Sequence, residues 1–95
     1  MAIYFKDPET NQEYSIRFKH FRNPGASYCD IFEEFDNNER YRLSEGVSNC
    51  HPNDNFCYET GRKLALKYAL IETPLSFRTT VWKAYFARTT TNSNR

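Results

Sequence analysis

The chain has 95 residues, of which 39% are hydrophobic and 17% aromatic, and its formal net charge is +1. This length suits one domain with a single, aromatic-rich core and excludes a second domain of ordinary size. No apolar stretch approaches the roughly 20 residues that a membrane-spanning helix needs, and MAIYFKDPET has no signal-peptide pattern, so we expect a cytoplasmic protein without a membrane partner.

The charges are unevenly distributed along the chain. Residues 1–26 carry four bases and three acids, residues 27–59 two bases and eight acids, and residues 60–95 seven bases and one acid. The segments can neutralise one another in the folded state, or they can form an electrostatically polarised binding surface.

The first part of the chain predicts a hairpin. Residues 2–6, AIYFK, alternate as a short strand with Ile3 and Phe5 on one face, and DPETNQ after them has the composition of a turn. In EYSIRFKHF, residues 13–21, the apolar face of the next strand is clear. This face carries Tyr14, Ile16, Phe18 and His20.

Two more strands are predicted between turn signals. The turn Asn23-Pro24-Gly25 precedes SYCDIFEEF, in which Cys29 and Ile31 can point inward while Phe32 stays partly exposed unless the strand has a bulge. After the turn at residues 36–38, RYRLSEGV forms a fourth strand. We expect its core face to carry Tyr41, Leu43 and Val47.

Opposite charges are predicted to face one another on the solvated side of this sheet. Alternation places Arg17, Lys19 and Arg42 across from Asp30 and Glu34. Such cross-strand pairs are typical of an antiparallel sheet with one open face.

From residue 53 the hydrophobic period becomes helical. We expect the buried stripe of this helix to consist of Cys57, Gly61, Leu64, Ala65, Tyr68 and Ile71. Gly61 costs about 1 kcal/mol relative to Ala inside a helix, so its position on this stripe indicates that the helix backbone passes close to the sheet. Leu66 and Leu70 do not fit the stripe and are expected to meet a second helix.

The second helix is predicted to start directly afterwards. Thr73 is the expected cap and Pro74 the first helical residue. Its apolar positions are Phe77, Val81, Trp82, Tyr85 and Phe86. We therefore predict an α+β fold, in which a four-stranded antiparallel meander is followed by a C-terminal helical hairpin packed on one face. Residues 1–88 form the single domain, and 89–95 form a disordered polar tail.

The stretch SNCHPNDNFCYETG offers the most chemistry in the chain. A structural zinc site needs four ligands, usually presented as close pairs, and the spacing of Cys50, His51 and Cys57 with distant Cys29 or His20 does not fit. Three cysteines also indicate reduced thiols rather than a disulfide framework.

A cysteine nucleophile is the second interpretation of this stretch. Cys57 near a helix start could be activated by His51 or His20, but no third group is identifiable that would orient the base, and a packing cysteine is favoured. The third interpretation is a helix cap, in which Asn53 or Asp54 accepts amide hydrogens after Pro52. The sequence favours the cap, so we predict no catalytic residue, no metal and no cofactor.

The segment GVSNCHPNDNFCYETGRKLALKYAL, followed by FRTTVWKAYFAR, resembles a pattern in small uncharacterised proteins carried by bacteriophages. In them a Gly-Val strand end, a Cys-x-Pro-x-Asp-x-Phe loop, a Gly-Arg-Lys helix and a Trp-x-x-Tyr helix follow a short sheet. The resemblance covers residues 46 to 88 and carries no catalytic residues over. It implies an accessory protein of the host cytoplasm that binds host machinery, including bacterial defence systems such as CRISPR nucleases.

Two functions from different classes follow. The first is a non-enzymatic inhibitor or adaptor that binds a host protein, with a nucleic-acid-guided nuclease as one such partner. Its candidate contact residues are Phe32, Glu33, Glu34, Asp36, Arg62, Lys63, Lys67 and Lys83.

The alternative function is nucleic-acid binding by the basic C-terminal helices. The bases available to phosphates are Arg62, Lys63, Lys67, Arg78, Lys83 and Arg88. The strand from Arg17 to Arg22 also interleaves bases with aromatics, although alternation places Phe18 in the core, and a pI of about 7.7 is below the strongly basic value typical of such domains.

Overall fold

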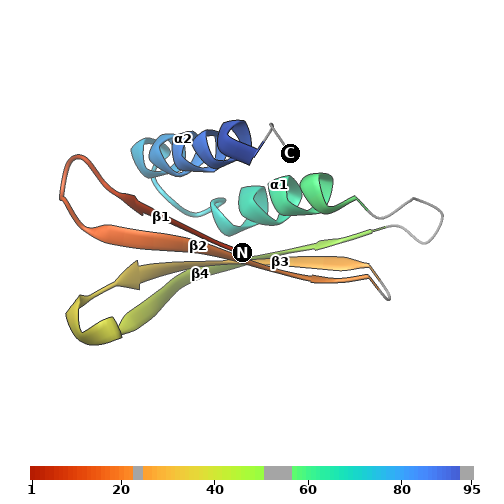
Figure 1. Ribbon diagram of the computed structural model, residues 1–95, viewed down its shortest axis with the longest axis horizontal. Helices are drawn as coiled ribbons and strands as arrows, with labels where there is room; N and C mark the ends of the chain where they lie inside the picture. The colour runs from red at the N-terminus through yellow and green to blue at the C-terminus, as the bar shows by residue number, and fades with distance from the viewer. Residues whose placement is uncertain (23–24, 51–56, 93–95) are drawn as a thin grey trace.

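The computed structural model describes residues 1–22, 25–50 and 57–92, and places the elements in two layers (Figure 1). Their order is β1 (Ala2–Lys6), β2 (Glu13–Phe21), β3 (Ala26–Glu34), a short 3-10 turn η1 (Asp36–Asn38), β4 (Arg40–Asn49), α1 (Tyr58–Ala69) and α2 (Leu75–Asn92). The strands form one antiparallel sheet in the order β1-β2-β3-β4, and both helices lie on the same face of it. This is the α+β meander with a C-terminal helical pair that the sequence predicted.

Asparagines with positive φ close two of the hairpin turns. Asn11, with φ of 62°, lies in the β1–β2 turn, where the Asn11 amide donates to the Asp7 carbonyl at 2.7 Å. Asn37 and Asn38 have φ of 71° and 62° in η1 between β3 and β4. Asparagine tolerates this left-handed conformation better than most residues, so the predicted turns at both places are confirmed.

The covered face of the sheet carries the predicted residues of the first three strands. Ile3, Ile16, Phe18, Cys29 and Ile31 are all buried there. They belong to one core cluster with residues of both helices, and the remaining members are Ala65, Leu66, Ala69, Leu70, Val81 and Tyr85.

The predicted core face of β4 is wrong. Tyr41 and Leu43 are 65% and 44% exposed, and Val47 lies opposite Tyr28 on the other face. Gly46 instead faces α1, so close that a β-carbon on it would meet the Ala65 carbonyl and the Ala69 amide. A bulge explains the switch: Ile31 pairs with Ser44 but the next residue of β3 pairs with Arg42, which shifts the alternation of β4 by one residue.

The predicted buried stripe of α1 is also partly wrong. The helix begins at Tyr58, and its buried residues are Gly61, Ala65, Leu66 and Ala69. The other predicted stripe residues, Leu64, Tyr68 and Ile71, are exposed. The small residues at positions 61, 65 and 69 let the helix backbone lie on β3 and β4, while Leu66 is buried in the core cluster that includes Val81 and Tyr85. The close approach predicted at Gly61 is confirmed, because a β-carbon there would meet the Ser27 hydroxyl.

The second helix completes the core. Leu66 and Leu70 are buried in the same cluster as Val81 and Tyr85, as expected for residues that meet a second helix. The predicted cap differs, because the Thr73 hydroxyl donates to the Leu70 carbonyl at 2.7 Å at the end of α1. The Pro74 carbonyl accepts the first helical bond of α2, from Arg78, so the helix starts one residue later than predicted.

The helix α2 ends at Asn92, beyond the end that we predicted at Arg88. Residues 93–95 of the predicted tail lie outside the described residues. Within the part of the chain that the structure describes, no helix is long and apolar enough to cross a membrane.

Candidate functional site

The cysteine-rich stretch is only partly covered by the structure. His51, Pro52 and the predicted caps Asn53 and Asp54 lie outside the described residues, and the residue that precedes α1 is Cys57. Cys57 is exposed rather than buried, contrary to our prediction. The side chain and backbone of Thr60 lower the pKa of its thiol. In residues 1–22, 25–50 and 57–92 no group of three metal-binding side chains comes together.

Two other side chains that could act as nucleophiles, Cys29 and Ser27, are fully buried. Cys29 is fully buried, and this burial raises the pKa of its thiol. The Ser27 hydroxyl lies 2.8 Å from His20 Nδ1, but Ser27 has no exposed surface and sits under α1 at Gly61. Burial, then the Arg62 charge, lowers the pKa of His20 and favours the neutral imidazole. The Cys29 thiol and the Ser27 hydroxyl are therefore shielded from solvent, whereas His20 is only partly buried.

A polar network joins the two helices above the core. The Tyr85 hydroxyl donates to Glu59 Oε2 at 2.7 Å, and Arg62 Nη2 donates to Glu59 Oε1 at 2.6 Å. Arg88 Nη2 lies 3.6 Å from the same carboxylate, and its guanidinium carbon is 4.7 Å from the centre of the Tyr85 ring. Burial raises the pKa of Glu59, but the hydrogen bonds from Arg62 and Tyr85 outweigh it, so the pKa is lowered. The network fixes α1 against α2 and uses Arg62, which we had predicted as a partner contact.

A second group of interacting side chains lies on the open face of the sheet, the face without helices. Arg17 Nη2 donates to the Tyr4 hydroxyl at 2.7 Å, and the guanidinium carbon lies 5.5 Å from the Tyr4 ring centre and 5.9 Å from that of Phe32. Arg40 approaches Phe32 as well, at 5.5 Å. Tyr4, Arg17, Phe32 and Arg40 thus form one continuous contact surface across four strands, which we call the open-face cluster. Guanidinium groups over aromatic rings are favourable contacts, worth about 0.5–1 kcal/mol each where solvent reaches them.

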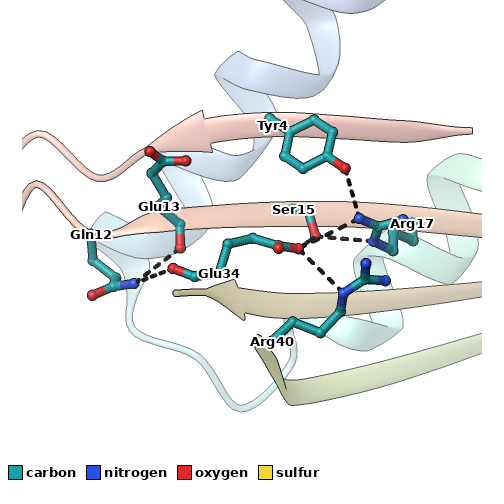
Figure 2. A network of polar contacts seen from close by, with 7 residues as sticks. All are labelled: Tyr4, Gln12, Glu13, Ser15, Arg17, Glu34 and Arg40. Carbon is teal, nitrogen blue, oxygen red and sulfur yellow. Dashed lines mark hydrogen bonds and ion pairs between the residues drawn. The ribbon is translucent and has the colours of Figure 1, made fainter. Parts of the chain in front are cut away.

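The Glu34 carboxylate lies among Ser15, Arg17 and Arg40 and contacts all three (Figure 2). One oxygen, Oε2, accepts a hydrogen bond from Ser15 at 2.5 Å, and lies 3.6 Å from Arg17 Nη2 and 3.9 Å from Arg40 Nε. The Glu34 side chain is only 14% exposed, whereas those of Arg17 and Arg40 are 26% and 42% exposed. The carboxylate therefore contacts two arginines that are both more exposed than it is.

Further along the same face, Arg42 pairs with Asp30 at 3.5 Å and with Glu45 at 3.6 Å. The predicted facing of Arg17 and Arg42 with Asp30 and Glu34 is therefore confirmed, while Lys19 lies opposite Tyr28. The arginines, Lys19 and Phe32 line a shallow depression on the sheet. A partner would meet fixed arginine and aromatic groups there.

The predicted contact residues do not form one surface. Phe32 and Glu34 lie on the open face, but Glu33 is opposite Tyr14 on the other side of the sheet, and Asp36 lies in η1. Lys63 and Lys67 are on α1, and Lys83 is on α2, all three exposed.

Sequence reasoning missed Tyr4, Arg17 and Arg40 as contacts for a protein partner, although it named Arg17 in the nucleic-acid-binding alternative. The signal was present for the first two, because strict alternation in β1 and β2 places both side chains outward. It was absent for Arg40, whose face depends on the bulge in β3–β4. The Glu59–Arg62–Tyr85–Arg88 network gives no sequence signal, since it joins residues up to 29 positions apart through the packing of two helices.

Comparison of the chain with protein-family models, with curated proteins and with solved structures gave no match. The resemblance to small bacteriophage proteins therefore stays a prediction from sequence.

Proposed function

We propose that this protein is a non-enzymatic binding protein that engages another protein through the open face of its sheet. The observation that carries the proposal is the open-face cluster, in which Tyr4, Arg17, Phe32 and Arg40 are held in one arrangement by Glu34 with no helix above them. Arginine and aromatic residues are the types enriched among the dominant contacts of protein interfaces. Their ordering before binding reduces the entropy that a complex would lose.

The charge arrangement favours a protein over a nucleic acid on this face. Asp30, Glu34 and Glu45 lie among the arginines, so phosphates would meet carboxylates at close range. The rings of Tyr4 and Phe32 are also contacted by guanidinium groups of the protein itself, which occupies the surface that a stacked base would use. A protein partner can match both signs of charge.

The alternative, nucleic-acid binding by the basic helices, receives less support. Arg62 and Arg88 contact Glu59 in the network between the helices, which removes two of the six bases from a phosphate-binding surface. Lys63 also lies 3.8 Å from Glu59.

The finer proposal is that the partner belongs to the host of a bacteriophage and that binding inhibits a defence system, such as a CRISPR nuclease. Its support is the resemblance of residues 46 to 88 together with the small size of the chain.

The proposal is tested by affinity capture of the tagged protein from nuclease-treated bacterial lysate, with the variants Arg17→Ala and Lys67→Ala in parallel. Lys67 is an exposed lysine of α1 away from the open face, and serves as the matched control. We expect one protein at stoichiometric amount with the wild type and Lys67→Ala, and its loss with Arg17→Ala. Capture that disappears on nuclease treatment, or that Arg17→Ala leaves unchanged, contradicts the proposal.

A further inference from the structure

The helix α2 carries a second set of apolar residues, of which Leu75 and Phe86 are exposed while Trp82 also packs against the core. Its inner residues, Val81 and Tyr85, are fully buried. On the outer side, Leu75 is 71% and Phe86 47% exposed, and the Trp82 ring stacks on Phe86 with 5.6 Å between ring centres. These three residues follow helical spacing over about 16 Å of the helix axis. They line an open depression of about 680 Å³ along α2, which we call the outer α2 face.

The same depression is lined by cations that lack a counter-charge. Residues 73–92 contain three bases, Arg78, Lys83 and Arg88, and no acid. Arg88 contacts Glu59, but Arg78 and Lys83 form no ion pair with any residue in the described parts of the chain. Arg78 Nε is buried there without a hydrogen-bond acceptor. On the open sheet face, in contrast, all three arginines pair with carboxylates.

The exposed apolar residues and the unpaired cations of the outer α2 face indicate which kind of partner could bind there. A second copy of the chain is disfavoured, because two such faces in contact would bring Arg78 and Lys83 against like charges. A partner helix with its own apolar stripe would pack against Leu75, Trp82 and Phe86 at matching spacing. Carboxylates beside that stripe would provide Arg78 and Lys83 with acceptors.

We propose that the outer α2 face is a second docking site, which binds an acidic amphipathic helix of a partner protein. The helix α2 lies on the covered side of the sheet, whereas the open-face cluster lies on the other side (Figure 1). The protein is then an adaptor with two binding surfaces. This second site does not depend on the first.

The single tryptophan, Trp82, reports on this site directly. The probe is a synthetic 18-residue helical peptide with leucines at i, i+3, i+4 and i+7 and glutamates beside them, titrated into the full chain. We expect the Trp82 emission to shift to shorter wavelength and saturate, as its ring leaves water. A matched peptide with lysine in place of every glutamate should bind at least about tenfold more weakly, because its charges repel Arg78 and Lys83.

Charge-reversal variants of the protein assign the binding to this face. Arg78→Glu combined with Lys83→Glu should weaken the acidic peptide about tenfold or more, while Lys67→Glu on α1 and Arg17→Ala on the open face should leave it within about twofold. The circular dichroism spectrum and melting temperature of each variant establish that it folds.

Three outcomes overturn the proposal. They are equal affinity for the two peptides, absence of a Trp82 shift with the acidic peptide up to millimolar concentration, and a Trp82 shift produced by vesicles of phosphatidylserine or by single-stranded DNA but not by the peptide. Loss of peptide binding in Arg17→Ala would also contradict the independence of the two sites.

Discussion

The part of the covered sheet face that lies under α1 and the open face differ in the size of the side chains that they carry. On the covered face, Gly46 and Ser27 lie directly under α1, whose contacting residues are Gly61, Ala65 and Ala69. On the open face, long arginine side chains and aromatic rings extend across the strands. Under α1 the covered face uses small residues so that the backbones can approach, which serves stability.

The open face holds its long side chains in order although surface ion pairs contribute only about 0–1 kcal/mol each to folding. The ordering of arginine costs side-chain entropy of comparable size. Little stability is therefore gained from the open-face cluster. The comparison indicates that one face of the sheet folds the protein and the other is available for recognition, and the predictions below test this division.

The largest effect is expected where α1 touches β4. In Gly46→Val, the new side chain would meet the Ala65 carbonyl and the Ala69 amide of the helix backbone, which must move away. We expect the free energy of unfolding to fall by about 3 kcal/mol or more. Urea denaturation measures this loss, with Val47→Ala on the opposite face as the control at about 1 kcal/mol. An unchanged midpoint for Gly46→Val would mean that α1 does not lie on β4 in this way.

The network between the helices should give the second-largest effect. Tyr85→Phe removes the hydroxyl that donates to Glu59 and leaves a partly buried carboxylate with one hydrogen bond fewer. The expected loss is about 1–2 kcal/mol of unfolding free energy. The matched control is Tyr68→Phe on α1, whose exposed side chain should give a change below about 0.5 kcal/mol. If Tyr85→Phe and Tyr68→Phe lower the unfolding free energy equally, the network between the helices does not stabilise the fold.

The pH dependence of stability should report the same carboxylate. Because the pKa of Glu59 is lowered in the folded state, its contribution is present above the ordinary value of 4.5 and is lost as pH falls through the folded pKa. We expect Glu59→Gln to flatten the fall in unfolding free energy below pH 4.5. The control is Glu72→Gln, an exposed carboxylate in the turn between the helices, which should keep the slope of the wild type. Parallel curves for all three proteins would contradict the lowered pKa.

The smallest effect on stability is expected on the open face. Arg17→Ala removes contacts to Tyr4, Glu34 and Phe32, but the Glu34 carboxylate keeps Ser15 and Arg40 as partners, so the unfolding free energy should change by only about 1 kcal/mol or less. The same change should abolish capture of the protein partner. A loss above about 3 kcal/mol would show that the open face also serves folding, against the division described above.

The fold followed from the sequence because its signals are local. Strict alternation in β1 and β2, asparagine-rich turns and the change to a helical period after β4 are each contained in a few neighbouring residues. The α+β class and the strand order could therefore be predicted.

The errors arose where packing decides between local alternatives. Leu64 and Tyr68 fit a helical stripe as well as Ala65 and Ala69 do, and only the distance of α1 from the sheet selects the small residues. The face of β4 depends on a bulge that no residue type in RYRLSEGV signals. The predicted contact residues fell on several surfaces for the same reason. Charge and hydropathy do not show that Arg62 pairs with Glu59, or that Arg17 and Arg40 both contact the Phe32 ring.

The central claim, that the open sheet face is the recognition surface, is tested most directly by site-specific photocrosslinking. Benzoylphenylalanine replaces either Tyr4 on the open face or Tyr68 on α1, both exposed tyrosines, and the two proteins are irradiated in nuclease-treated bacterial lysate. We predict a single discrete protein adduct from position 4 and none of that mass from position 68. The same adduct from both positions, or from position 68 alone, would contradict the account.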